Sequence, residues 1–306
     1  PHTMLLHSLT PFALAFVLLL FMVSALMVLL ARVAFRKPRQ KGTRAFAWFC
    51  ISISIYALGY GMELISAGEA SFLFWNRFQY IGIAGIPGLA LLIAIRYTSP
   101  YHWLRGKSIA LPFVIPFITL VLRYTDHLHG LVYQSYTLDE VMGMQVVNIT
   151  EGIWYWVQIV YINLSILAAF LLTLRHYFQS KQPYRTQTGI MILGMLAPWA
   201  GHLVYAAGGS YAGLDLSPFF FGIFGVFMAI GLFRYGLFDL TPIAREHIFE
   251  NMRDAAIVLD NQMRLVDFNP KAAALFAWNH NDNVGKAVKS VFRDHPVILD
   301  FLNSQK

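Results

Sequence analysis

Seven long apolar segments limit what this chain of 306 residues can fold into. A helix that crosses a hydrocarbon core of about 30 Å needs roughly 20 residues at 1.5 Å each. Only 13% of the residues are charged, against about 25% in soluble globular domains. These features exclude soluble, fibrous and disordered proteins, and they predict an all-α membrane protein with a seven-transmembrane helix bundle. The predicted spans are Pro11–Ala34, Arg44–Ala67, Ser71–Tyr97, Ser108–Leu122, Ile153–Leu174, Gly189–Ala207 and Ser217–Phe233.

Basic residues are concentrated in alternate loops between these spans. They follow spans one, three, five and seven, whereas the long loop 124–152 carries four acids and no Lys or Arg. Lys and Arg favour the cytoplasmic side of a membrane. We therefore predict an N-terminus outside, a cytoplasmic C-terminus and a multi-pass protein of the bacterial cytoplasmic (inner) membrane. The net charge of +7 then reports topology, and we expect no nucleic-acid partner.

The composition changes to that of a soluble protein from Thr241 onward. Thr241 is a good N-cap and Pro242 a good first-turn residue, which predicts a helix to about Met252. Strands are predicted at Ala255–Asp260 and Met263–Asp267, and a helix at Lys271–Trp278. The predicted parts are residues 1–3 (added in cloning before Met4) and 4–10 outside, 11–234 as the bundle, 235–252 as a linker helix, and 253–306 as a partial α/β domain.

Several short motifs occur in an order and at spacings that resemble one known family. They are Tyr56–Tyr60 with Glu63-Leu64, Phe74-Trp75 with Gln79–Gly82, Arg96–Thr98, His127–Leu131, Leu232–Arg245, Val258–Asp260 and Arg264–Lys271. From about residue 11 the chain resembles the bacterial seven-helix sensor region at the N-terminus of many histidine kinases and some diguanylate cyclases, followed by the start of a PAS domain. One departure is Asp126, three residues before His129, where the family often has Asn.

The resemblance implies a membrane receptor of two-component signal transduction. Such a receptor detects a small-molecule or membrane-derived signal and passes it through helix seven to the PAS domain. It also implies a homodimer and a response regulator downstream of the kinase. No phosphoacceptor-His helix, ATP-binding glycine box or Gly-Gly-Asp-Glu-Phe motif occurs in the chain, so we expect no catalytic residue here and a parent histidine kinase. The alternatives are the input region of a diguanylate cyclase and, less favoured, a small-molecule transporter.

Polar side chains are costly inside a bilayer, so their depth along a predicted helix is informative. Polar and aromatic residues gather in the outer halves of spans two, three, five and six, beneath the long acidic loop. That pattern is typical of an extracytoplasmic small-molecule pocket. The candidate ligand-binding residues are Tyr56, Tyr60, Glu63, Asn76, Arg77, Gln79, Tyr80, Trp154, Gln158, Tyr161, Trp199, His202 and Tyr205.

Structural roles remain open for some of these candidates. Glu63 and Arg77 lie at nearly the same predicted depth on antiparallel neighbours, where they could form an ion pair. Trp154 could belong to an aromatic belt at the membrane interface. His202 could make a hydrogen bond between two helices.

Other classes of site and function lack the residues that they need. The single cysteine, Cys50, excludes a disulfide framework and a cysteine-based metal site. His127 and His129 resemble a metal-binding pair but have one acid beside them, so we expect no metal and no cofactor. A retinal Schiff base requires a Lys in a span, and the predicted spans contain none. A transporter predicts an inverted repeat and ionisable groups at the midplane, which the sequence does not show.

Overall fold

The computed structural model describes residues 9–36, 42–98, 106–180, 184–206, 213–235, 248–260, 262–293, 295 and 298. The chain divides between Phe238 and Asp239 into two compact units. The helices of the first unit are α1 (Pro11–Phe35), α2 (Thr43–Leu64), α3 (Glu69–Thr98), α4 (Val114–Tyr124), α5 (Ile153–Gln179), α6 (Tyr184–Ala206) and α7 (Ser217–Arg234).

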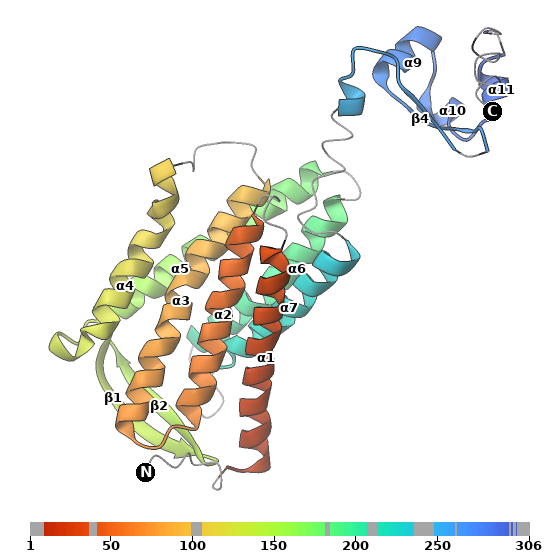
Figure 1. Ribbon diagram of the computed structural model, residues 1–306. Helices are drawn as coiled ribbons and strands as arrows, with labels where there is room; N and C mark the ends of the chain where they lie inside the picture. The colour runs from red at the N-terminus through yellow and green to blue at the C-terminus, as the bar shows by residue number, and fades with distance from the viewer. Residues whose placement is uncertain are drawn as a thin grey trace. The chain divides into compact units, whose positions relative to one another are not determined.

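The helices of the first unit form a closed bundle (Figure 1). Helix α1 packs on α2, and α2 packs on α3. Helix α3 contacts α5, α5 contacts α6, and α6 contacts α7. Helix α7 contacts α1 and so closes the ring. Helix α4 lies outside this ring against α3 and α5. The seven-helix bundle that the apolar segments predict is therefore present, and its interior is enclosed by α2, α3, α5, α6 and α7.

Small residues allow α2 and α3 to approach closely along the ring. A Cβ atom placed on Gly82 would lie 2.2 Å from the backbone oxygen of Ser52 and 2.8 Å from the amide nitrogen of Tyr56. No side chain fits in that space, so glycine is required there. The close approach brings the polar faces of α2 and α3 together at the hairpin end of the bundle.

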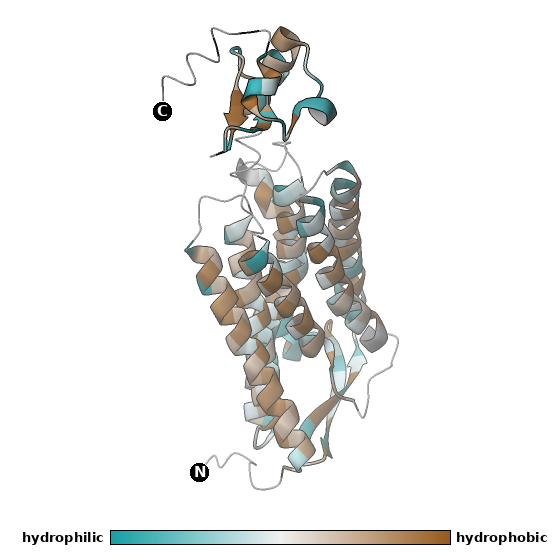
Figure 2. Ribbon diagram, turned by 90° about the vertical axis from the view of Figure 1, so that its right-hand side faces the viewer, coloured by the Kyte–Doolittle hydropathy of each residue, from teal (hydrophilic) through white to brown (hydrophobic). Residues whose placement is uncertain are grey.

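Among the described residues, five helices are long and apolar enough to cross a membrane by length and composition, namely α1, α2, α3, α5 and α7. Figure 2 shows apolar residues along most of the bundle surface. Only 22% of the most apolar 18-residue stretch of α5 is buried inside the bundle. Large side chains such as Val160 and Leu164 are exposed along this helix. An exposed apolar face of this length is suited to lipid and not to water.

The fourth predicted span differs from a single α-helix. Residues Gly106–Phe113 form a 3-10 helix, and α4 begins only at Val114. Pro112 and Pro116 lack the amide that an α-helix needs, which explains the change. Because a 3-10 helix rises about 2.0 Å per residue and an α-helix 1.5 Å, the two parts are each about 16 Å long.

The acidic loop 124–152, for which no strands were predicted, contains a β-hairpin. Strand β1 (Tyr133–Val141) pairs antiparallel with β2 (Met144–Glu151), and Val141 is opposite Met144. Met142 and Gly143 both have positive φ, 56° and 83°, as in the tight turns that suit hairpins. Met144 is fully buried against the bundle core. The hairpin is therefore a packed part of the bundle.

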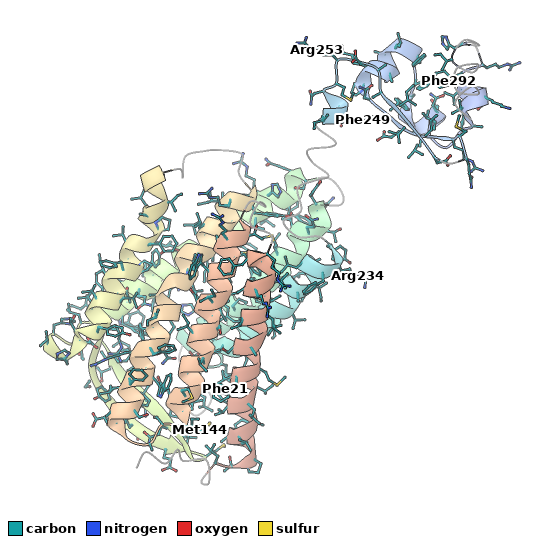
Figure 3. All side chains as sticks on the ribbon, viewed as in Figure 1. Phe21, Met144, Arg234, Phe249, Arg253 and Phe292 are labelled. Atoms are coloured by element: carbon teal, nitrogen blue, oxygen red, sulfur yellow. The ribbon has the colours of Figure 1, made fainter. Side chains whose placement is uncertain are left out.

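The two ends of the bundle differ in character. The hairpin lies at the end where α1 begins and where α2 turns into α3 (Figure 1), and the Thr10 amide donates to the Met142 carbonyl at 3.3 Å. Figure 3 places Met144 at this end and Arg234 toward the other. The described basic residues Arg36, Arg96 and Arg185 also lie at helix ends away from the hairpin. The hairpin end is thus the end that the charge pattern predicts to be extracytoplasmic.

The second unit is a small α/β fragment. Strands β3 (Ile257–Leu259) and β4 (Leu265–Phe268) pair antiparallel, and α9 (Pro270–Phe276), α10 (His280–Asn283) and α11 (Val288–Val291) follow. The Asn269 side chain caps α9 by accepting from the Ala272 amide at 2.9 Å. The predicted strand–turn–strand and helix are present. Most of the predicted helix Thr241–Met252 lies outside the described residues, and its residues 248–250 are helical.

Candidate functional site

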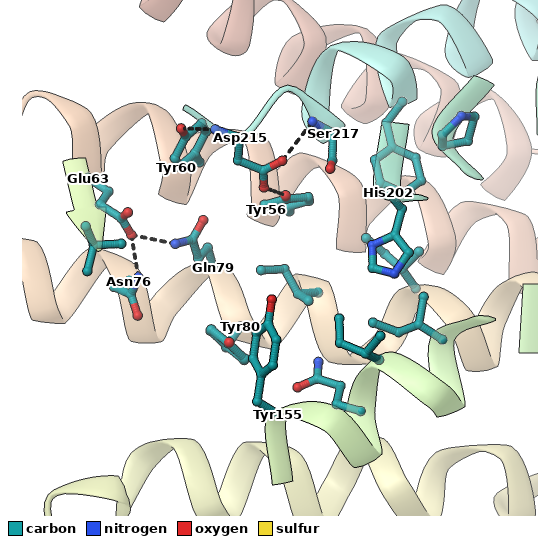
Figure 4. Close-up of a pocket in the computed structure, with 18 of the residues that line it drawn as sticks. Tyr56, Tyr60, Glu63, Asn76, Gln79, Tyr80, Tyr155, His202, Asp215 and Ser217 are labelled. Atoms are coloured by element: carbon teal, nitrogen blue, oxygen red, sulfur yellow. Dashed lines mark hydrogen bonds between the residues drawn. The ribbon is translucent and has the colours of Figure 1, made fainter. Parts of the chain in front are cut away.

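A cavity of about 140 Å³ lies inside the bundle at the hairpin end. Helices α2, α3, α5, α6 and α7 and both strands of the hairpin contribute to its wall (Figure 4). The polar or aromatic part of the wall consists of Tyr56, Tyr60, Glu63, Asn76, Gln79, Tyr80, Tyr133, Gln145, Tyr155, Gln158, His202, Asp215, Ser217 and Phe221. Isoleucines, valines, two prolines and other apolar residues form the remainder.

Helical periodicity places the polar residues on shared faces. Tyr56, Tyr60 and Glu63 are four and three residues apart on α2, so they lie above one another on one side of that helix. Asn76 and Gln79 are three residues apart on α3, so they share one side of that helix, and this side faces α2. The sequence therefore builds the site from two facing polar stripes, which the hairpin and α5 close.

Glu63 is the buried acid at the centre of the α2–α3 contact. Its side chain is 2% exposed, and its Oε2 atom accepts hydrogen bonds from Asn76 Nδ2 at 2.9 Å and from Gln79 Nε2 at 2.5 Å (Figure 4). Among the described residues no ion pair joins Glu63 to Arg77, so the ion pair left open as a structural role for these two residues does not form. One residue along a helix is a rotation of about 100°, and this rotation turns Arg77 away from the face that Asn76 presents to Glu63.

A buried ion pair extends this network toward the hairpin. Arg123, at the end of α4, is 4% exposed and lies 3.2 Å from Asp126 Oδ2. The same guanidinium donates from Nη2 to Asn76 Oδ1. Asp126 in turn accepts from the amides of Val132 at 2.9 Å and Tyr133 at 3.0 Å. Asp126 therefore anchors the start of the hairpin. This residue is the one noted above as a departure from the Asn of the family that the sequence resembles.

Two tyrosines pack beside this ion pair. The Arg123 Cζ atom lies 4.1 Å from the ring centre of Tyr133 and 5.3 Å from that of Tyr80. The hydroxyls of Tyr80 and Tyr133 are 3.0 Å apart. Burial raises the pKa of the Tyr133 phenol, which keeps it neutral at physiological pH. The hairpin is thus fixed to α3 by polar contacts as well as by apolar packing.

Asp215 connects the cavity to α7. Its Oδ1 atom accepts from the Ser217 amide at 2.8 Å, at the first residue of α7. Its Oδ2 atom accepts from the Tyr56 hydroxyl, and its own amide donates to the Tyr60 hydroxyl at 2.7 Å (Figure 4). Asp215, which lies two residues before the start of α7, is therefore held by Tyr56 and Tyr60 of α2, and both tyrosines also line the cavity.

Eight of the thirteen predicted site residues line this cavity. They come from four helices, and their common position agrees with the depth and face that the sequence predicts for them. The eight are Tyr56, Tyr60, Glu63, Asn76, Gln79, Tyr80, Gln158 and His202. His202 Nε2 also lies 3.4 Å from Asn163 Nδ2 of α5, so the helix–helix contact expected for it exists alongside its place in the wall.

Four of the other five predicted residues, Arg77, Trp154, Tyr161 and Trp199, are not part of the cavity wall. Arg77 is only partly buried and is absent from the wall. Trp154 donates to Thr119 Oγ1 of α4 at 2.9 Å. The side chain of Tyr205 lies outside the described part of the chain.

Tyr161 and Trp199 also use their polar atoms in contacts between elements. The Tyr161 hydroxyl donates to the Pro112 carbonyl in the 3-10 helix. Trp199 Nε1 donates to Asn163 Oδ1 of α5 at 3.3 Å. With their polar atoms bonded in this way, both side chains hold neighbouring elements in place.

Sequence reasoning missed several residues of the wall. Asp215 lies between two spans and has no periodicity that marks it, although an acid just before Ser217-Pro218 is a helix-capping signal. Tyr133 and Gln145 belong to the hairpin, whose Met142-Gly143 turn between β-prone runs was the available signal. Tyr155 lies in the first turn of α5, one residue after Trp154, which we had selected. Among the described residues no group of three or more His, Cys, Asp or Glu side chains could hold a metal.

The fold and the cavity define a helical membrane bundle with an internal site, joined to a small α/β unit. Residues 8–242 match the N-terminal 7TM region of histidine kinase, and residues 246–304 match a PAS domain. The first match covers more than half of the chain, which therefore belongs to the family of N-terminal 7TM regions of histidine kinases. The family resemblance predicted from the motifs is confirmed, and neither matched region is a catalytic domain. No curated protein matches the chain.

Proposed function

We propose that this chain is the sensory input region of a bacterial sensor histidine kinase and that the cavity binds its signal molecule. The cavity lies within the bundle and combines apolar walls with a few convergent polar groups, as small-molecule sites do. The charge pattern places it in the outer half of the membrane protein. A ligand from outside the cell would therefore reach it from the hairpin end.

The observation that carries this proposal is the position of Asp215 between the cavity and α7. Asp215 bonds Tyr56 and Tyr60 in the wall and also bonds the first amide of α7. A ligand that displaces either tyrosine changes the contacts that hold this helix end. Helix α7 then runs 18 residues without interruption to Arg234, which precedes the PAS unit in the chain. A continuous helix is a suitable carrier for such a displacement.

The remaining parts of the proposal concern the assembly around the input region. We place the protein in the bacterial inner membrane with its bundle in the lipid bilayer. Its active form is a homodimer, and a kinase domain after the PAS domain phosphorylates a response regulator. The match to the histidine kinase family favours this output over a diguanylate cyclase.

The test uses the full-length product of the gene in membrane vesicles. Ile162→Trp fills the cavity from α5, and Val160→Trp adds the same group to the exposed face of that helix. We expect Ile162→Trp to change autophosphorylation from ATP by at least about threefold, roughly 0.7 kcal/mol of coupling, and Val160→Trp to match wild type. Equal activity in the two variants contradicts sensing through the cavity. Synthesis of a cyclic dinucleotide without phosphohistidine assigns the input to a cyclase.

A further inference from the structure

The cavity wall contains two acidic side chains and, among its described residues, no Lys or Arg. Glu63 and Asp215 both line it and interact electrostatically with each other. Two carboxylates that face one cavity repel each other unless a cation or a proton enters it.

Arg123 supplies only part of the missing positive charge. This guanidinium lies behind Asn76 and is absent from the described wall, and its Nη1 atom is 3.2 Å from Asp126. It pairs with Asp126 and also attracts Glu63. One guanidinium therefore serves three acidic side chains, and two of these acids, Glu63 and Asp215, line the cavity.

The unused hydrogen-bonding capacity of the wall includes two oxygen acceptors. Both bonds to the nearly fully buried Glu63 carboxylate go to Oε2, and Oε1 has no partner among the described residues (Figure 4). The Oε1 atom of Gln145 is buried and also lacks a partner there. A buried acceptor without a donor, such as the Gln145 atom, is costly. A ligand that brings N–H donors into the cavity would bond Glu63 Oε1, to which neither Asn76 nor Gln79 donates.

The rest of the wall suits the two ends of a small amphipathic cation. Tyr60, Tyr80 and Tyr155 line the polar region, and tyrosine rings attract cations through their negative faces. Ile159, Ile162 and other aliphatic residues of α5 line the remainder. The cavity of about 140 Å³ holds on the order of ten water-sized groups. That volume excludes peptides and large lipids.

We propose that the ligand is a small organic ammonium ion, a protonated primary amine with a short apolar chain. Its nitrogen lies between Glu63 and Asp215, and its chain points to the isoleucines of α5. This inference rests on the proposed function of the cavity as a sensory site. It extends that function by giving the chemical class of the signal molecule.

The test measures thermal unfolding of the whole chain in lipid nanodiscs at constant ionic strength. Butylammonium, butyrate, 1-butanol and tetramethylammonium serve as probes of similar size that differ in charge or in N–H donors. We expect a saturable rise in Tm with butylammonium, a smaller one with tetramethylammonium, and none with butyrate or butanol. Glu63→Gln and Asp215→Asn should each weaken butylammonium binding by at least about tenfold. Glu140→Gln, on the exposed surface of the hairpin, should leave it unchanged.

Three results overturn the ammonium inference. One is stabilisation by butyrate or butanol that equals or exceeds that by butylammonium. Another is butylammonium binding that survives both carboxylate variants, which places it elsewhere. The third is no saturable Tm change with any probe on wild type. Saturable butanol binding that Ile162→Trp abolishes would keep the cavity as a ligand site of another class, and the autophosphorylation assay judges the proposed function independently.

Discussion

The backbone amide of Asp215 donates a 2.7 Å hydrogen bond to the hydroxyl of Tyr60. This contact joins a residue just before α7 to the C-terminal part of α2, 155 positions earlier in the chain. Because Tyr60 also lines the cavity, a change in the cavity and a change at the start of α7 are linked through one hydroxyl group. The following predictions test this link and the network that supports it.

Tyr60→Phe should lower stability by about 1–3 kcal/mol, because it leaves the Asp215 amide without its acceptor in a buried setting. Tyr124→Phe is the matched control, since that tyrosine is 45% exposed at the end of α4. Equilibrium unfolding of both purified variants in bicelles measures the difference. Equal stability of the two variants would show that the hydroxyl of Tyr60 has no structural role.

Glu63 should be coupled to Gln79 and not to Arg77. In a double-mutant cycle we expect Glu63→Ala and Gln79→Ala to show an interaction energy of about 1 kcal/mol or more. The cycle of Glu63→Ala with Arg77→Ala should be additive within about 0.5 kcal/mol. Unfolding free energies of the single and double variants provide both values. The reverse order of coupling would restore the ion pair that the sequence suggested.

Asp126→Ala should release the hairpin from the bundle. It removes one member of a buried ion pair, a loss of about 3–5 kcal/mol, together with two bonds to hairpin amides. Asp126→Asn should lose less, because an amide oxygen still accepts from Val132. Hydrogen exchange at residues 132–135 reports the release, with Asp139→Ala on the exposed strand as control. Unchanged exchange in Asp126→Ala would contradict the anchoring role.

Gly82→Ala should destabilise the bundle by about 3 kcal/mol, because the added methyl group meets the backbone of α2. Gly85→Ala, one turn along, meets only the Ser52 hydroxyl at 3.2 Å, so its effect should stay within about 1 kcal/mol. Unfolding of the two variants under the same conditions gives the comparison. A loss of stability in Gly82→Ala as small as that in Gly85→Ala would show that α2 and α3 can separate without cost.

The parts of the fold that depend on local pattern could be predicted from the sequence. The seven helices follow from apolar length, and eight wall residues follow from helical face and depth. The hairpin was missed because its strands lie in a polar loop and pair only with each other. Asp215 was missed because its role depends on Tyr56 and Tyr60, which are distant in the sequence. The Glu63–Arg77 ion pair that the sequence left open does not form, because equal depth does not fix which side of a helix a residue occupies.

Hydrogen exchange at the first turn of α7 tests the central claim most directly. In the 306-residue chain in nanodiscs, Ile162→Trp should crowd the cavity and weaken the bond from the Ser217 amide to Asp215. We predict exchange at residues 215–219 that is at least about tenfold faster than in wild type, while Val160→Trp leaves it unchanged. Identical exchange in the two tryptophan variants would contradict the coupling between the cavity and helix α7.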